Sequence, residues 1–365
     1  MSNKTQTLRV LFIQDSSPCI RNIKYAEALN NNGIEVHLLY RDKSPTEGYG
    51  RGDNFYKSLT RFKYRFRLLD RIKRMVSDKA IDLIHYHNQP DVLGASIIKA
   101  NLSVPVVFDC HDFMSFKHHL SRREKAAERT CNEESQGVIY PSAMYMEEAM
   151  KHYRFTPRRL VFGNYYPAAL LVNTQDFLPK LSTQDGKIHL VFQGRIAEKH
   201  SDHRYLAAHL REFDPQRFSI HLFPSNSKEF SEYKAIPAVE LHQKLPYAEL
   251  MKAMTAMDYG LVMFQDSIAA KLPAIRYAFG NKTFDYLCAG LPILVQDSLD
   301  EIRNFVNANE VGMPLSSLNT VPISGQPEYQ ALRDRVLKIR EEYSMERQIQ
   351  NLIRFYQECM GSYES

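Results

Sequence analysis

The sequence predicts an α/β protein of two facing domains, each an open parallel sheet covered by helices. The chain has 365 residues, more than a single hydrophobic core usually holds. Short β-rich runs alternate with helical patterns, which is typical of parallel sheets. The alternation occurs twice, before and after an aperiodic stretch at 165–187 that we interpret as a linker. We therefore expect ligands to bind at the carboxyl ends of the strands and between the domains.

The first domain is predicted over residues 1–168. Its strands are short runs rich in branched and aromatic residues, at 8–14, 35–40, 82–87, 105–110, 137–140 and 160–164. Helical patterns separate these runs, over about 18–32, 51–79, 90–101 and 120–135 and from Ser142 onward. Gly33 follows the first helical pattern, at a position where glycine commonly ends a helix.

The second domain is predicted over residues 186–344. Its strands are expected at 188–193, 218–223, 238–242, 258–263 and 292–296. Its helices are expected over about 201–211, 246–256, 280–290 and 327–342, and one more follows at 345–360. Gly290 is expected to end the third of these helices.

Composition argues against several classes of protein. Hydrophobic residues make up 44% and charged residues 24%, which is unlike disordered, collagenous or coiled-coil chains. The longest uncharged apolar run, at 286–296, is too short to span a bilayer, and the N-terminus does not resemble a signal peptide. The five cysteines form no C-x-x-C pair, which indicates reduced thiols. We expect a soluble cytoplasmic protein without a zinc site or disulfides.

The net charge of +5 is unevenly distributed. Residues 1–170 carry 26 basic against 18 acidic residues, whereas 171–365 carry 21 against 24. The excess concentrates at 51–79, with ten basic and three acidic residues. Apolar residues recur there at steps of three and four, as on one face of a helix. They are Phe55, Leu59, Phe62, Phe66, Leu69, Ile72 and Val76.

This predicted basic helix has two interpretations. In one it lies on an anionic membrane surface, with Arg65, Arg67, Arg71 and Arg74 toward the lipid or the acceptor. In the other its apolar face packs on the core and its charges stay in water. Nucleic acid is not expected as a partner, because no recognition motif accompanies the charge.

The turn after the first strand contains no glycine, so the G-x-G-x-x-G fingerprint of dinucleotide binding is missing. Nicotinamide and flavin chemistry by that route are therefore disfavoured. Arg21 lies just beyond this turn. It either contacts an acidic ligand or forms an ordinary surface ion pair.

An anion site is predicted at 194–199, with the sequence GRIAEK, directly after a buried strand. Gly194 permits a sharp turn, and Arg195 and Lys199 place two cations beside the expected N-terminus of the next helix. A diphosphate would fit this arrangement. The alternative is two exposed loop cations without a ligand.

A second binding feature is predicted at 280–292, with the sequence GNKTFDYLCAGLP. Gly280 and Asn281 form a loop, and Lys282 and Asp285 lie one turn apart at the start of a helix. The carboxylate could accept hydrogen bonds from vicinal hydroxyls, or it could simply favour the helix dipole.

His111 follows the strand at 105–110 directly. A histidine at the end of such a strand either faces the ligand crevice or has a structural role.

Together, GRIAEK, NKTFDYLCAGLPILV and the strand-end His111 resemble the retaining nucleotide-sugar glycosyltransferases of family 4, and the resemblance covers nearly the whole chain. It implies the GT-B fold, which consists of two facing Rossmann-like domains. It also implies that a C-terminal helix at about 345–365 crosses back to the first domain.

The resemblance implies a role for each candidate residue. Arg195 and Lys199 hold the donor diphosphate, with Gly194 at the turn, and Asp285 binds the donor ribose. His111 lies beside the transferred sugar. Further residues lie near the donor phosphates and sugar: Gly280, Asn281, Lys282 and Thr283, and Tyr277, where many members have glutamate.

Retaining members are thought to react by front-face attack, in which the leaving phosphate accepts the acceptor proton. No dedicated carboxylate base is then needed, and the sequence offers no suitably spaced pair. No Asp-x-Asp motif is present, so neither a metal nor another cofactor is expected.

The expected function is transfer of a hexosyl or N-acetylhexosaminyl group from a nucleotide diphosphate sugar to a glycan or lipid-linked acceptor, with retention. The expected setting is cell-surface polysaccharide or glycolipid assembly, in the cytoplasm or at the inner membrane face. Two alternatives remain open: a non-catalytic GT-B partner of another enzyme, and an epimerase, which would need cleft carboxylates.

Overall fold

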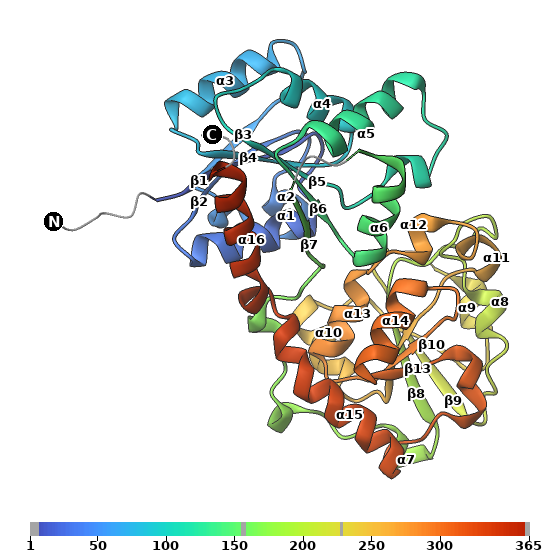
Figure 1. Cartoon of the computed structure of the whole chain (residues 1–365). Coiled ribbons are helices and arrows are strands. Elements are labelled where there is room, and N and C mark those ends of the chain that lie inside the picture. The colour runs from blue at the N-terminus through green and yellow to red at the C-terminus, as the bar shows by residue number, and fades with distance from the viewer. Residues whose placement is uncertain (1–6, 155–157, 227–228, 362–365) are drawn as a thin grey trace. The chain divides into compact units, whose positions relative to one another are not determined.

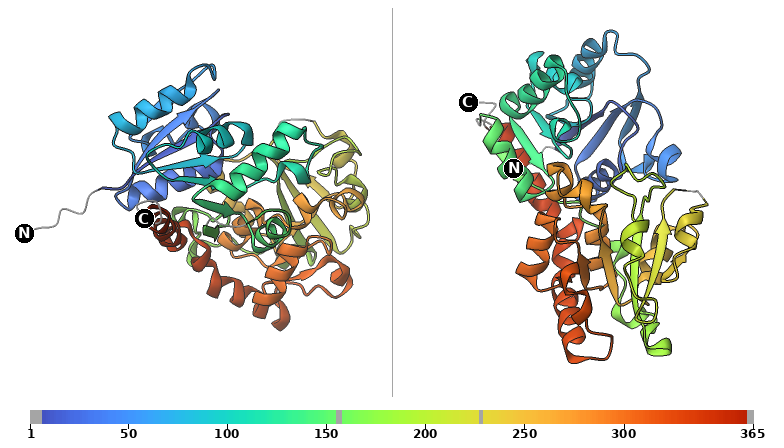
Figure 2. Two further views of the ribbon diagram at one scale, coloured as in Figure 1. Left: turned by 45° about the horizontal axis from the view of Figure 1, so that its top comes forward. Right: turned by 90° about the vertical axis from the view of Figure 1, so that its right-hand side faces the viewer.

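The computed structural model describes residues 7–154, 158–226 and 229–361, and the chain divides into two compact units (Figure 1). The first unit contains Met1–Gly163 and Met345–Ser365, and the second contains Asn164–Ser344. Each unit is built on one parallel sheet covered by helices (Figure 2). The prediction of an α/β protein with two parallel sheets is confirmed.

The first unit contains a seven-stranded parallel sheet in the order β3-β2-β1-β4-β5-β6-β7. Its strands are β1 (Arg9–Gln14), β2 (Glu35–Tyr40), β3 (Ser58–Arg61), β4 (Leu83–His87), β5 (Val106–Asp109), β6 (Gly137–Tyr140) and β7 (Arg158–Val161). Strands β4, β5 and β6 are buried along their whole length, as expected for a sheet covered on both faces.

Seven α-helices belong to the described part of this unit. They are α1 (Ile20–Asn31), α2 (Pro45–Tyr49), α3 (Leu68–Asp78), α4 (Asp91–Lys99), α5 (Arg122–Glu134), α6 (Ala143–His152) and α16 (Met345–Gly361). The terminal helix α16 packs on the first unit, where the Tyr356 hydroxyl lies 2.5 Å from His85 Nδ1 of β4. The predicted return of the C-terminal helix to the first domain is confirmed.

The second unit contains a six-stranded parallel sheet in the order β10-β9-β8-β11-β12-β13. Its strands are β8 (Ile188–Gly194), β9 (Phe218–Pro224), β10 (Val239–Leu241), β11 (Tyr259–Val262), β12 (Ile293–Val295) and β13 (Gly312–Pro314). Its helices are α7 (Ser182–Asp185), α8 (Ala207–Leu210), α9 (Ser231–Lys234), α10 (Tyr247–Met254), α11 (Asp266–Ala269), α12 (Pro273–Arg276), α13 (Asn281–Cys288), α14 (Asp300–Asn309) and α15 (Pro327–Ile339). Residues 165–187, which we interpreted as a linker, lie within this unit and include α7.

The predicted single helix over 51–79 is wrong. The edge strand β3 occupies part of this range, and α3 begins only at Leu68, after Arg67 in a left-handed conformation. Pairing with β2 satisfies backbone groups that a helix would have satisfied internally. The apolar residues do not form one face either, because Phe62 is buried whereas Phe66 is exposed.

The predicted helix over 201–211 is also largely absent. Only α8 is helical there, and turns occupy most of the chain between β8 and α8. Helix α13 agrees well with its prediction: Gly280 precedes it, and Gly290, with a φ of 70°, follows its last turn.

None of the described helices is both long enough and apolar enough to cross a membrane.

Close packing of α13 on β11 depends on a glycine. A Cβ atom on Gly260 would lie 2.1 Å from Cγ of the Tyr286 ring. The Tyr286 hydroxyl donates to the Leu261 carbonyl at 3.0 Å, so the ring cannot move away without losing a buried hydrogen bond. This contact fixes the position of α13 above the sheet.

We predict that Gly260→Ala lowers the free energy of unfolding by about 3 kcal/mol, because overpacking a rigid core costs about that much. Gly48→Ala is the control, since a Cβ on Gly48 would meet no atom within 4 Å. Thermal denaturation followed by circular dichroism measures both. Equal midpoints for the two variants would contradict this account.

Candidate functional site

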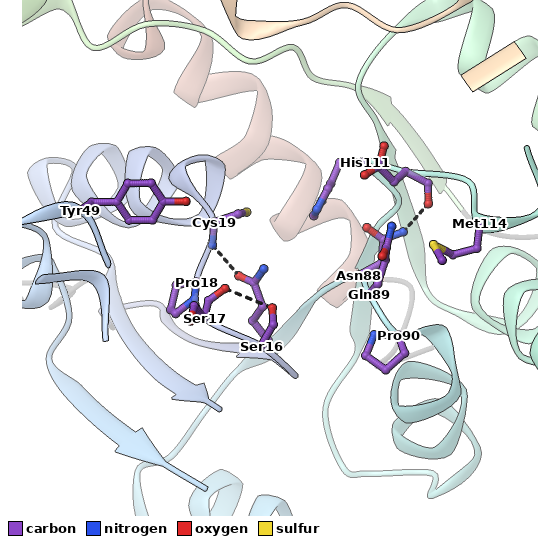
Figure 3. A pocket seen from close by; sticks show the side chains of 12 residues that line it. Ser16, Ser17, Pro18, Cys19, Tyr49, Asn88, Gln89, Pro90, His111 and Met114 are labelled. Atoms are coloured by element: carbon purple, nitrogen blue, oxygen red, sulfur yellow. Dashed lines mark hydrogen bonds between the residues drawn. The ribbon is translucent and has the colours of Figure 1, made fainter. Parts of the chain in front are cut away.

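A pocket of about 460 Å³ lies at the carboxyl ends of β1, β4 and β5 in the first unit (Figure 3). Figure 3 shows Tyr49 and the turn after β1 on one side, and His111 with the turn after β4 on the other. No lysine or arginine occurs among the described residues that line the pocket. These residues are Gln14, Ser16, Ser17, Pro18, Cys19, Tyr49, Asn88, Gln89, Pro90, His111, Asp112 and Met114.

Hydrogen bonds fix the two turns that form the pocket walls. The Cys19 amide donates to Gln14 Oε1 at 3.1 Å, which holds the turn between β1 and α1. Asn88 Nδ2 donates to the Asp112 carbonyl at 2.6 Å, which joins the turns after β4 and β5. Asn88 Oδ1 is buried and has no hydrogen-bond partner among the described residues. The pocket therefore offers amide and hydroxyl groups in a fixed arrangement.

Beneath the pocket, Asp109 at the end of β5 forms a buried ion pair with Arg21 of α1. Arg21 Nε lies 2.9 Å from Asp109 Oδ2, and both side chains are almost fully buried. The guanidinium also donates to the carbonyls of Phe162, at 2.7 Å, and Gly163, at 3.2 Å. The expectation that Arg21 contacts a ligand or lies on the surface is therefore wrong: its partner is an interior carboxylate.

Three histidines surround Asp109. His85 Nε2 and His87 Nδ1 lie 3.6 and 3.5 Å from Oδ2, and His111 Nδ1 lies 3.8 Å from Oδ1. Burial lowers the pKa of His85, and it lowers the pKa of His87 to about 3. The pKa of Asp109 is lowered well below its ordinary value, because Arg21 and the histidines outweigh the cost of burial. Both interior histidines are therefore neutral at pH 7, next to a charged carboxylate.

His111 is the one member of this group that lines the pocket. Its side chain is partly exposed, and the histidine rings of His85 and His87 lie behind it in the interior. The strand-end histidine thus lies at a cavity of the first unit, and its place beside the transferred sugar stays a prediction.

In the second unit, the backbone turns sharply after β8. Gly194 has a φ of 119°, which favours glycine. Arg195 and Lys199 are exposed, and neither side chain forms an ion pair or hydrogen bond with another described residue. Two free cations therefore lie at the carboxyl end of β8. The expected helix N-terminus does not accompany them, because α8 begins only at Ala207.

Asp285 of α13 lies beside the end of β8. Its Oδ2 accepts a hydrogen bond of 2.7 Å from Gln193 Nε2, and its Oδ1 accepts one from the Tyr247 hydroxyl. Only 2% of Asp285 is exposed. Gln193 and Tyr247 were not predicted. Gln193 is the polar residue that ends an otherwise apolar strand, which was an available signal, whereas nothing in the sequence marked Tyr247.

Lys282 lies against two aromatic rings one turn before Asp285. Its Nζ is 3.7 Å from the centroid of the Phe192 ring and 5.0 Å from that of Phe264. Shielding from water and the nearby Arg204 together lower the pKa of Lys282 to about 7, against the opposite effect of Asp285. Lys282 is therefore less than fully charged near neutral pH in the absence of an anion.

The other predicted donor residues occupy the same segment. Gly280 is the N-cap of α13 and Asn281 begins the helix. Thr283 Oγ1 is buried and has no hydrogen-bond partner among the described residues. Tyr277 follows α12, and the Arg276 guanidinium lies 5.5 Å from its ring centroid. The structure thus brings the predicted donor residues of the second unit to the carboxyl edge of one sheet.

Within the part of the chain that the structure describes, two groups of side chains have the composition of a metal site: His85, His87 and Asp109, and also His221, Glu240 and His242. The rings of His85 and His87 are stacked 4.2 Å apart at 7°, so no single point lies in the plane of both, where the nitrogen lone pairs point. In the second group, the ring nitrogens of His221 and His242 lie 2.9 Å apart and form a hydrogen bond with each other. Whether the reaction needs a metal stays a prediction.

Both units match known families. Residues 23–162 match the family described as Glycosyltransferase Family 4, and residues 203–353 match the family described as Glucosyltransferase 3-like, C-terminal domain. No curated protein matches the sequence.

Solved structures of glycosyltransferases share the fold at low sequence identity. A glycosyltransferase from Rickettsia africae is 10% identical with a TM-score of 0.68, covering 97% of this chain and 99% of that one. Anabaena Alr3699/HepE, in complex with UDP and glucose, is 15% identical with a TM-score of 0.69, covering 95% and 99%. Sucrose-phosphate synthase from Thermosynechococcus elongatus is 13% identical with a TM-score of 0.60, covering 98% and 94%.

The buried histidines make stability dependent on pH. The unfolded chain has a histidine pKa near 6.5, whereas the pKa of His87 in the folded protein is about 3. Between these two pKa values the unfolded chain binds more protons than the folded protein. The contribution of the neutral His87 to the free energy of unfolding is therefore complete above about pH 6.5 and is lost as the pH falls.

We predict that the low pKa of His87 alone decreases the free energy of unfolding by about 2 kcal/mol when the pH falls from 7 to 5. Urea denaturation of the wild type and of His87→Gln at both values measures this. The variant should lose less stability than the wild type. An identical loss in both would show that His87 is not held neutral.

Proposed function

We propose that the chain is a family 4-like glycosyltransferase that transfers a sugar from a nucleotide diphosphate sugar to a glycan or lipid-linked acceptor with retention of anomeric configuration. The matches of its two parts to glycosyltransferase family models and its GT-B fold support this proposal. The transferred group is a hexosyl or N-acetylhexosaminyl unit. The setting is assembly of a cell-surface polysaccharide or glycolipid on the cytoplasmic side of a membrane.

The single observation that carries this proposal is the pair of free cations after β8. Arg195 and Lys199 have no partner among the described residues, and they share a sheet edge with Asp285. Exposed cations beside a strand end suit a diphosphate, which presents several anionic oxygens. The Anabaena protein has been solved with UDP and with UDP-glucose, which supports a nucleotide diphosphate sugar as the donor class.

Each donor residue has a chemical task in this proposal. The Arg195 guanidinium and the Lys199 ammonium bind the diphosphate and stabilise the charge that it gains on leaving. The Asp285 carboxylate accepts hydrogen bonds from the ribose hydroxyls, next to those that it accepts from Gln193 and Tyr247. Lys282 gains charge when the anionic donor approaches, because an anion raises the pKa of a nearby ammonium group.

The reaction follows from these tasks. The acceptor hydroxyl oxygen forms a bond to the anomeric carbon on the face from which the diphosphate departs. The bond between that carbon and the diphosphate oxygen breaks, and the diphosphate keeps the electron pair. The acceptor proton moves to the leaving phosphate oxygen. Configuration is retained, and no carboxylate base takes part.

The acceptor is assigned to the pocket of the first unit. Its lining combines hydroxyl, amide and aromatic side chains with His111, Asp112 and a few apolar residues, and no lysine or arginine lines it among the described residues. Such a lining suits the hydroxyls of a neutral saccharide better than a phosphate group. His111 lines this pocket and is proposed to lie beside the transferred sugar.

One observation favours the alternative of a non-catalytic nucleotide- or glycan-binding partner. Asp285 is almost fully buried, and both of its oxygens already accept hydrogen bonds. Turnover that depends on Arg195 would exclude this alternative.

We predict that Arg195→Ala lowers kcat for sugar transfer by about a hundredfold, because removing one charge-stabilising donor typically costs that much. Lys187→Ala is the matched control, since Lys187 precedes the same strand at its opposite end. Its kcat should equal that of the wild type. Equal effects of the two substitutions would reject the phosphate role of Arg195.

We also predict that the product has the same anomeric configuration as the donor. Proton NMR of freshly formed product measures the coupling constant that distinguishes the anomers. An inverted product would contradict front-face attack and would require a general base that the present assignment lacks.

A further inference from the structure

The loop between β3 and α3 exposes two aromatic side chains. Tyr64 is 70% exposed and Phe66 is 86% exposed. The other exposed large hydrophobic residues of the described chain are scattered singly and are less exposed: Tyr49, Met150 and Leu178. Two aromatic rings two positions apart, both in water, are a costly feature for a surface loop and therefore point to a partner.

The loop is held in place rather than loosely extended. Phe62 and Leu68, at its two ends, are both buried in the first unit. Between the two aromatic residues, Arg65 forms an ion pair with the buried Asp15 at the end of β1. Arg65 therefore ties the middle of the loop to the domain while its two aromatic neighbours stay exposed.

Basic residues precede and follow the aromatic pair along the chain. Lys63 and Arg67 flank it in the loop, and Lys73 and Arg74 are exposed on α3. The acidic side chain that pairs with one of them is Asp70, whose Oδ2 lies 3.2 Å from Arg67 Nε. The surface therefore combines two exposed aromatic rings with a net positive charge.

Helix α3 itself does not supply the apolar face. Four of its apolar residues, Leu68, Ile72, Met75 and Val76, are buried in the first unit, and Leu69 is half-buried. The interpretation in which the apolar face of the helix packs on the core therefore holds for α3, whereas the surroundings of its charges stay a prediction. Phe66 is the one fully exposed member of the apolar series predicted at 51–79.

We propose that the loop at 63–67 docks the first unit on a bilayer that contains anionic lipid. Tyr64 and Phe66 enter the interfacial region, where aromatic rings are favoured. Lys63, Arg67, Lys73 and Arg74 contact lipid phosphates, which adds an electrostatic attraction. Exposed rings favour a bilayer over a soluble polyanion, which would satisfy the cations and leave the rings in water. This proposal does not depend on the donor assignments.

The natural chain contains no tryptophan, so one introduced tryptophan reports on its own position. Phe66→Trp should show a blue-shifted emission with vesicles of phosphatidylcholine and phosphatidylglycerol, and brominated lipid should quench it. Vesicles of phosphatidylcholine alone should give a much weaker response. Met150→Trp, on α6 of the same unit, is the matched control and should not respond.

The cations are tested by Lys63→Glu, Arg67→Glu, Lys73→Glu and Arg74→Glu in the Phe66→Trp protein. Vesicle sedimentation should show at least a tenfold loss of binding to anionic vesicles, since each cation near such a surface contributes substantially. Arg65 and Arg71 are left unchanged, because Arg65 pairs with Asp15 and Arg71 donates to the Arg61 carbonyl. Circular dichroism confirms that the variants are folded.

Three results would overturn the proposal. The first is no emission shift of Phe66→Trp with anionic vesicles. The second is an equal shift with a soluble polyanion such as dextran sulfate, which would indicate an anionic polymer as the partner. The third is a shift that grows with protein concentration without vesicles, which would indicate a second copy of the chain.

Discussion

The buried ion pair between Arg21 and Asp109 is the interaction on which the site of the first unit depends. It joins α1 to the end of β5, and the same guanidinium holds the carbonyls that follow β7. Removing two charges from water is costly, and only partners on several sides offset that cost. The turns after β1 and β5, which form two walls of the pocket, are thereby held at a fixed separation. The pair also keeps a negative charge beside His111 without exposing it.

In the second unit, close packing rather than a buried ion pair fixes the positions of the candidate site residues. Contact between Gly260 and the Tyr286 ring seats α13 directly on β11. Asp285, the neighbour of Tyr286, is then within hydrogen-bond distance of Gln193 at the end of β8. Parallel strands bring their carboxyl ends to one edge, so residues distant in sequence meet there. The cations after β8 stay free because no described acidic side chain lies close enough to pair with them.

The sequence was informative where one local signal decides the structure. Inner strands such as β6 and β12 are continuous apolar runs, and α13 lies between Gly280 and Gly290. It was misleading at 51–79, because apolar steps of three and four also fit a buried strand end followed by a short helix. It could not show that Arg21 points inward, since Asp109 lies far along the chain. The hydrogen bond from Gln193 to Asp285 also joins residues that are distant along the chain, so the sequence could not show it either.

The claim at the centre of this account is that the second unit binds a nucleoside diphosphate through Arg195, Lys199 and Asp285. The most direct test is the thermal midpoint of unfolding with UDP, GDP, ADP, TDP or CMP, each with and without magnesium. A ligand at about 100 times its dissociation constant adds roughly 2.7 kcal/mol to stability, which is readily detected. The account predicts that one nucleoside diphosphate raises the midpoint without magnesium and that Arg195→Ala abolishes the rise. No response to any nucleotide, or an undiminished rise in the variant, would contradict it.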